Sequence, residues 1–518
     1  MSDDHRRSAR RLGLSQPRVT PPPVLEAPPD SIELVPYSVY PPVFFWPRVM
    51  GRPGRRVVAA TFAVGVVAAI MLPSAEPGLG WLVSVVAALA GVGWVAWERP
   101  MAGGQTWWRA RWERLGWAVL AILLVSVTVF RAAGWLCVLA LLGAVVAATL
   151  AATGGRRWGE LAFALVGLPV AGLRGISWLA RGLRVVPRTE QRVWRLGVAL
   201  AVGVVLLVVF GALFAGADAG FAQLLRGLTP RVDGGSAAWS LLVFCAAGIG
   251  VVGACYLLVS RPVAVPRGPG KRLRRAEWAV PVGLLVVLFA VFVAVQVAAL
   301  FGGSGYVLRT SGLTYAQYAR SGFWELLWVT VLTLLVIWAA VRLADRDADR
   351  GWLRGLLGSL AGLTVVIVVS ALTRMWSYQQ AYGFTVLRLL VETCEVWLGV
   401  IYLLIIVAGV RMRAGWIARS AVALAMLAVL ALAVLNPEGF IARHNIERWQ
   451  ATGRLDSGYL GGLSADAVAA VRALPQPEQG CVLVVIASRL GADDWRSWNA
   501  SRAAARAELA GQGPACGE

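Results

Sequence analysis

The sequence is poor in charged residues and in the side chains on which most catalytic sites depend. Only 15% of its 518 residues are Asp, Glu, Lys or Arg, one residue is lysine, and two are histidine. It contains no Walker A loop, no HExxH motif, no CxxC pair and no GxSxG elbow. These absences argue against P-loop nucleotidases, common zinc peptidases, thioredoxin-like oxidoreductases and α/β-hydrolases. We therefore predict no cofactor, no metal site and no assigned catalytic residue.

Apolar residues, in contrast, are abundant. The chain is 58% hydrophobic with a mean hydropathy of +0.68, which is typical of a polytopic membrane protein. A net charge of +21 would indicate nucleic acid in a soluble protein. Here the arginines concentrate between alternate apolar runs, as the positive-inside rule describes. We predict membrane lipids as partners, anionic on the cytoplasmic face, and no nucleic acid.

Apolar runs near the ~20 residues that cross ~30 Å of hydrocarbon recur along the chain. We count about eleven: 57–72, 79–97, 115–130, 133–152, 196–216, 238–260, 278–301, 323–343, 353–373, 387–410 and 416–435. The predicted fold is all-α, a polytopic helical membrane bundle of about 11 spans. Charge placement predicts a multi-pass plasma-membrane protein with a cytoplasmic N-terminus and an extracytoplasmic C-terminus.

The chain divides into three predicted regions. Residues 1–50 read as a disordered, Pro-rich cytoplasmic tail, residues 51–435 as the transmembrane bundle, and residues 436–518 as a small, mainly helical extracytoplasmic domain. The Arg-rich inner loop 156–195 has an apolar middle, Trp158 to Leu183, which predicts interfacial helices or, alternatively, a twelfth span. Ala246, Gly250 and Ala254 have the small-xxx-small spacing of closely packed helices.

The C-terminal region is more polar and predicts several short helices. They are expected at Phe440–Trp449, Asp456–Leu463, Ser464–Leu474 and Trp495–Leu509, whereas Val482–Ile486 fits a helix or a strand. Cys481 and Cys516 also lie here, and on an oxidising side of the membrane they predict a disulfide, with two free thiols as the alternative.

The stretch Arg374–Gly399 carries the chemistry that is hardest to explain as lipid-facing surface. It reads as an aromatic, polar loop that continues into an apolar helix with two carboxylates, Glu392 and Glu395. On a helix, Arg388, Glu392, Glu395, Gly399 and Tyr402 share one face. Ionisable groups near the bilayer centre cost ~2.5 kcal/mol and upward, so they normally face a bundle interior or a water-filled cavity. The stripe predicts a solvent-connected cavity or, alternatively, a structural Arg–Glu network.

Other polar residues at span ends are predicted to meet this stripe in the extracytoplasmic leaflet. The candidate outer polar cluster comprises Asp218, Tyr315, Tyr318, Arg320, Glu325, Arg374, Tyr378, Tyr382, Arg388, Glu392 and Glu395. For the arginines and tyrosines taken singly, anchoring at the membrane interface is the competing interpretation. His444 fits a base or ligand but, without a cluster around it, a surface or capping residue better. The run from Asp345 to Arg350 fits a solvated loop better than a metal site.

Three longer motifs carry a family resemblance: the fifteen residues from Gly312, the fifteen from Arg374, and the segment from Asn436 to Val468. With them the chain, from about residue 50 onward, resembles bacterial polytopic membrane proteins grouped as domain of unknown function 4173, with the sister family 4153. The resemblance implies an actinobacterial-like, multi-span membrane protein and no activity that transfers. Its motifs map onto Tyr315, Tyr318, Arg320, Arg374, Tyr378, Tyr382, Arg388, Asn445, Asp456, Tyr459 and Asp466, which overlap the outer polar cluster.

Three functions fit these observations. The favoured one is a transport-like or sensory protein with an outward-facing polar cavity for an unknown envelope ligand. A membrane enzyme acting on a lipid or cell-envelope precursor, with Glu392, Glu395 or His444 as acid–base groups, is the first alternative. A membrane scaffold for partner proteins is the second.

Overall fold

The structure, a computed structural model, describes most of the chain after residue 43. The described residues are 44–46, 49, 51–73, 76–97, 106–154, 161, 163–183, 234–260, 263–264, 273–301, 323–345, 348–411 and 415–510. They belong to one compact unit that begins at Phe44. The predicted tail lies almost entirely outside them, as does the predicted span 196–216.

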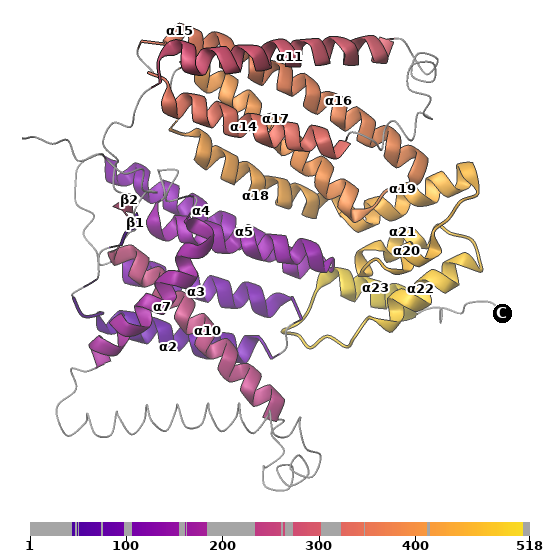
Figure 1. Cartoon of the computed structure of the whole chain (residues 1–518). Helices are drawn as coiled ribbons and strands as arrows, with labels where there is room; N and C mark the ends of the chain where they lie inside the picture. Colours follow the sequence, from indigo (N-terminus) through magenta and orange to yellow (C-terminus); the bar gives the residue numbers. More distant parts are fainter. Residues whose placement is uncertain are drawn as a thin grey trace, which may run out of the picture. The chain divides into compact units, whose positions relative to one another are not determined.

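Within this described part, the secondary structure is helical except for one short antiparallel pair, β1 (Phe44–Phe45) with β2 (Val263–Ala264). The longer helices, shown in Figure 1, are α2 (Arg55–Met71), α3 (Leu79–Trp97), α4 (Thr106–Phe130), α5 (Gly134–Thr153), α7 (Ala164–Leu183), α10 (Gly234–Val259), α11 (Arg275–Phe301), α14 (Phe323–Leu343), α16 (Gly358–Tyr382), α17 (Val386–Arg411) and α18 (Ile417–Leu435). The short helix α15 (Arg350–Trp352) and the π-helical turn η2 (Leu353–Leu357) lead into α16. The all-α prediction is confirmed.

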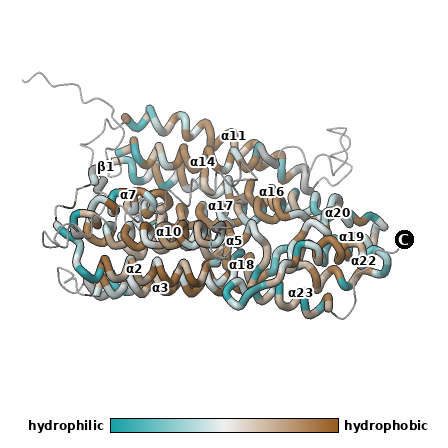
Figure 2. The backbone as a smooth tube through the Cα atoms, turned by 90° about the horizontal axis from the view of Figure 1, so that it is seen from below, coloured by the Kyte–Doolittle hydropathy of each residue, from teal (hydrophilic) through white to brown (hydrophobic). Residues whose placement is uncertain are grey.

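Nine stretches among the described residues are long and apolar enough to cross a membrane, and each coincides with a predicted span. The first predicted span is α2, whose 17 residues are shorter than those nine. The outer faces of these helices are apolar as well; Leu284 and Val291 of α11 are 67% and 58% exposed. Figure 2 shows the hydrophobic residues running along the bundle and the hydrophilic ones gathering at helix ends and in the C-terminal region. Such surfaces suit lipid rather than water, and the chain is a multi-pass membrane protein.

Two groups of helices pack around separate cores. One core draws on α2, α5, α7 and α10, and another on α11, α14, α16 and α17. A third core joins α4, α5 and α18 to the C-terminal helices. Because α18 contacts α17 on one side and α4 and α5 on the other, it links the two groups.

The inner-loop prediction is resolved in part: residues 164–183 form one helix, α7, packed along α10. Its close approach requires glycine, because a Cβ on Gly253 of α10 would lie 2.8 Å from the backbone of Leu168 and Gly172. The helix contact predicted from Ala246, Gly250 and Ala254 does not involve Gly250, because a Cβ added to this glycine would meet nothing within 4 Å. Whether α7 lies in the interface or crosses the membrane stays a prediction.

The C-terminal helices are α19 (Pro437–Thr452), α20 (Ser457–Gly461), α21 (Val468–Val471), α22 (Glu478–Ser488) and α23 (Ala500–Ala510), with a 3₁₀ turn η3 (Ala465–Ala467) before α21. The segment that fitted a helix or a strand is helical, in α22. The expected helix from Trp495 was placed too early: α23 begins after Asn499, whose side chain accepts from the Arg502 backbone N–H (3.0 Å). Cys481 takes part in a disulfide. Its predicted partner Cys516 lies outside the described residues, so that pairing stays a prediction.

Candidate functional site

The polar stripe of α17, defined as Arg388, Glu392, Glu395, Gly399 and Tyr402, faces the neighbouring helices α14 and α16. Tyr402 is fully buried and donates its hydroxyl to the Thr330 carbonyl of α14 (2.5 Å). Gly399 packs on Val368 of α16, where a Cβ would lie 3.1 Å from the valine Cγ1. At 1.5 Å rise per residue, the stripe extends ~21 Å along the helix, most of the ~30 Å hydrocarbon thickness.

Glu395 is the most isolated polar group of the stripe. Its side chain is completely buried (0% exposed). Neither carboxyl oxygen has a hydrogen-bond partner among the residues that the structure describes. A buried polar group without a partner costs roughly 1–3 kcal/mol, and an isolated buried charge costs considerably more. This carboxyl is therefore a costly feature of the interior of the bundle.

Glu392 lies one helical turn closer to the α16–α17 connection and does have a partner. The Gln379 amide of α16 donates to its Oε2 (3.1 Å). Gln379 is itself fully buried, and its Oε1 lacks a donor in the described part of the chain. The two carboxyl groups thus differ in environment although they lie on the same face of one helix.

Arg388 does not form the predicted Arg–Glu network. Its guanidinium donates to the backbone carbonyls of Tyr382 (3.3 Å) and Gly383 and to the Tyr378 hydroxyl (3.3 Å). It also lies over the Tyr378 ring, 4.4 Å from the centroid. Across the described residues, no ion pair joins it to Glu392. The Arg388 side chain thus caps the C-terminus of α16 by bonding its last carbonyl groups.

Arg374 to Tyr382 are helical, and the loop predicted there is wrong. α16 continues through them to Gly383, which has a φ of +84°. Asn445 of α19 holds this turn, accepting from the Phe384 N–H (2.8 Å) and donating to the Phe384 carbonyl (2.9 Å). A Cβ on Gly383 would lie 2.7 Å from the Asn445 Oδ1. The turn therefore depends on a contact 61 residues away that local sequence patterns do not reveal.

A second polar contact lies between α11 and α16. Gln296 of α11 accepts hydrogen bonds from Ser370 (3.1 Å) and Arg374 (2.6 Å) of α16. The sequence interpretation missed Gln296 and Ser370. Gln296 had a detectable signal, because it is the one amide within the predicted span 278–301.

The remaining predicted cluster members fall into two sets. Glu325 and Tyr382 are exposed, at the start of α14 and the end of α16 respectively. Asp218, Tyr315, Tyr318 and Arg320 lie outside the described residues. The structure therefore gathers Glu392 and Glu395 with Gln379 and Tyr402 along one helix interface. Arg374, Tyr378 and Arg388 make other contacts, and only the four undescribed members stay predictions.

The C-terminal family motif residues bind helix ends. The Asp466 carboxylate accepts from the Ala132 and Ala133 N–H groups (2.9 and 2.8 Å) at the start of α5. The Tyr459 hydroxyl accepts from Val386 N–H (2.8 Å) at the start of α17, and burial raises the pKa of that phenol. Asp456 N-caps α20 through the Tyr459 N–H (2.9 Å). These positions thus satisfy backbone groups that helix termini leave unpaired.

Further side chains from the same region cap other helices. Asn499 donates to the Thr128 and Arg131 carbonyls (2.9 and 2.8 Å) at the end of α4, and Arg496 donates to the Ile70 carbonyl (2.9 Å) at the end of α2. We call the end of the bundle where the C-terminal helices lie, visible in Figure 1, the capped end. The opposite end, where α2, α11, α15 and α18 begin, is the basic end.

His444 and Asp349 are less exposed than predicted from the sequence, which indicated a surface or capping histidine and a solvated loop from Asp345 to Arg350. His444 Nδ1 donates a hydrogen bond to the Phe440 carbonyl (3.0 Å), and the imidazole packs on the Phe384 and Phe440 rings. Asp349 is buried (5% exposed), and hydrogen bonds from Arg275 and Trp278 hold its carboxyl pKa below the ordinary value. The described residues contain no group of three or more His, Cys, Asp or Glu side chains placed to hold a metal ion.

The fold and this site define a multi-pass helical membrane protein with a polar helix interface inside the bundle and a helical cap at one end. The chain belongs to the family described as domain of unknown function 4153, whose model matches residues 118–474. The match is thus to the sister family of the expected resemblance, and membership of family 4173 stays a prediction. The matched residues 118–474 include the polar stripe and Asp466. No curated protein and no solved structure matches the chain.

Proposed function

We propose that this membrane protein is transport-like or sensory, and that Glu395 takes up and releases a proton at the interface of α14, α16 and α17. The observation that supports the proposal is the complete burial of this carboxyl without a hydrogen-bond donor among the described residues. A group that costs stability and stabilises nothing nearby is typical of a functional position.

The surroundings of Glu395 suit proton exchange better than permanent charge. Without a donor or a cation beside it, the carboxyl is better accommodated in its neutral form inside the bundle. Glu392, which bonds the Gln379 amide, lies one turn from Glu395 towards the capped end. Tyr402 and Thr330 lie towards the basic end. The stripe thus offers polar groups on both sides of the carboxyl.

The enzyme alternative has less support. His444, the one described imidazole, contacts Phe384 and Phe440 and bonds a helix carbonyl, as a packing residue does. The scaffold alternative has no specific observation in its favour. We therefore retain proton exchange linked to transport or sensing as the proposed function.

The test uses the purified full-length protein in liposomes, with the proton as probe. Two readouts are followed after a pH jump: internal pH, with an entrapped dye, and tryptophan fluorescence. Transport predicts proton flux; sensing predicts a fluorescence change without flux. In both cases Glu395→Gln abolishes the response, whereas the matched control Glu325→Gln, an exposed carboxyl at the start of α14, keeps it. A parent protein without either response, or a Glu395→Gln variant that keeps it, contradicts the proposal.

A further inference from the structure

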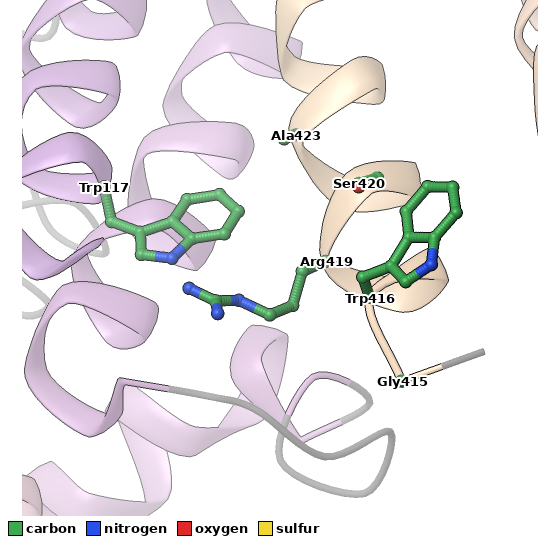
Figure 3. Close-up of a pocket in the computed structure, with 6 residues that line it drawn as sticks. All are labelled: Trp117, Gly415, Trp416, Arg419, Ser420 and Ala423. Atoms are coloured by element: carbon green, nitrogen blue, oxygen red, sulfur yellow. The ribbon is translucent and has the colours of Figure 1, made fainter. Parts of the chain in front are cut away.

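A pocket of about 420 Å³ lies between α4 and α18, away from the polar stripe. It is lined by Trp117, Gly415, Trp416, Arg419, Ser420 and Ala423 (Figure 3). α4 ends at the Asn499 contact and α18 ends beside α19, so their N-terminal halves, which line the pocket, lie towards the basic end. The volume is within the range of about 300–1,000 Å³ that small-molecule sites have.

Arg419 supplies the charge in this pocket. Its side chain extends from α18 towards Trp117 of α4 in Figure 3. It pairs with Glu113 of α4 through Nη2 (3.2 Å), and the two side chains are 22% and 33% exposed. A guanidinium has five N–H donors, and Nε and Nη1 of Arg419 bond no other residue that the structure describes. Donors therefore remain for an anionic group in the pocket.

The depth of the pocket identifies the class of ligand. Arg419 is two residues into the span Ile417–Leu435, and Trp117 is six residues into the span Arg111–Phe130. At 1.5 Å rise per residue these positions are ~3 Å and ~9 Å from the ends of their spans. An arginine at the depth of Arg419 reaches the level of lipid headgroups, whereas Trp117, which is 6% exposed, forms a deeper wall of the pocket. Further into the same spans, Leu123 of α4 and Leu427 of α18 are exposed and give these helices apolar surface for acyl chains.

We propose that this pocket binds one membrane phospholipid, with its phosphate on Arg419 and its acyl chains along α4 and α18. Arginine binds phosphate oxygens through paired N–H donors, and the Trp117 indole faces the Arg419 guanidinium across the pocket (Figure 3). Glu113 lies beside the phosphate position, where it disfavours an anionic headgroup and favours an ammonium headgroup. The site is independent of the proposed function at Glu395.

The test is native mass spectrometry of the purified protein in detergent, titrated with phosphatidylglycerol or phosphatidylethanolamine. Arg419→Gln is expected to lower retention of both lipids about tenfold, because one charge-assisted phosphate contact is lost. The control Arg350→Gln removes the same charge from an exposed position at the basic end and should leave retention unchanged. Glu113→Gln should increase phosphatidylglycerol retention, an effect that mere loss of the ion pair would not produce.

Equal losses in Arg419→Gln and Arg350→Gln would overturn the proposal, since they indicate diffuse charge attraction rather than a site. A decrease of phosphatidylglycerol retention in Glu113→Gln would also overturn it.

A third test uses Ser420→Cys in native membranes. Covalent dimers formed through this cysteine would show that a second copy, rather than a lipid, covers the pocket.

Discussion

At the scale of single residues, Glu392 and Glu395 show how the free-energy cost of burying the same side chain differs between positions one helical turn apart. The Gln379 amide bonds Glu392 (3.1 Å), whereas Glu395 is enclosed without a donor among the described residues. Helical spacing predicts that both lie on one face. It does not predict which of them has a partner, because that depends on the residues that α16 and α14 present opposite each carboxyl.

We predict that Glu395→Leu raises the thermal unfolding midpoint while it abolishes the response to pH. Leucine removes a buried polar group without a partner, which stabilises a protein by about 1–3 kcal/mol. The measurement is thermal unfolding in detergent micelles, with Glu325→Gln as control. A lower midpoint in Glu395→Leu would show that the carboxyl has a stabilising partner and would contradict the account of its isolation.

At the scale of elements, the C-terminal helices stabilise the bundle by capping helix ends. The start of α5 is the clearest case, because the buried Asp466 carboxylate accepts two backbone N–H groups there. A carboxylate at a helix N-terminus gains from both the hydrogen bonds and the helix dipole. In the sequence analysis Asp466 is one of the motif positions of the family resemblance; its contacts explain it as a structural residue.

Asp466→Asn is therefore expected to lower the free energy of unfolding by about 2 kcal/mol, the order of a charge-assisted hydrogen bond. Urea or thermal unfolding in detergent measures it. Glu447→Gln, on the exposed face of α19, removes the same charge and should change stability by less than about 0.5 kcal/mol. Equal stability of the two variants would mean that the cap at α5 contributes nothing.

The contact between α7 and α10 gives a second element-scale prediction. Gly253→Ala places a Cβ 2.8 Å from the backbone of Leu168 and Gly172, so the helices must separate, at a cost of about 1–3 kcal/mol. Gly250→Ala on the same helix meets no atom within 4 Å and should be neutral or slightly stabilising. Limited proteolysis within α7 reports the difference. Cleavage at the same rate in both variants would rule out this close packing.

At the scale of the whole molecule, the spans were predictable and their connections were not. Length and hydropathy are local properties, so nine predicted spans match helices of the structure. The helical extension of α16 to Tyr382 was missed, because the turn that ends it is held by Asn445 from across the fold. The late start of α23 was missed although its cap is local, since Asn499 accepts from the Arg502 N–H. The pocket beside Arg419 could not be predicted from the sequence either, because it depends on the distance between α4 and α18.

The two ends of the bundle also give a prediction of topology. The basic end should face the cytoplasm, and the capped end the outside, because basic residues stay on the cytoplasmic side. A membrane-impermeant maleimide should label Glu447→Cys in intact cells and Arg350→Cys after lysis only, with the unsubstituted protein as the background. The reverse pattern would invert the proposed orientation and place the C-terminal helices inside.

The central claim is that Glu395 carries a proton inside the bundle, and infrared spectroscopy of the purified protein tests it most directly. At neutral pH the account predicts a carbonyl band of a protonated carboxyl that shifts in deuterated water, disappears in Glu395→Gln and persists in Glu392→Gln. A spectrum in which Glu395→Gln removes only carboxylate absorption, and leaves every protonated-carboxyl band in place, would contradict it.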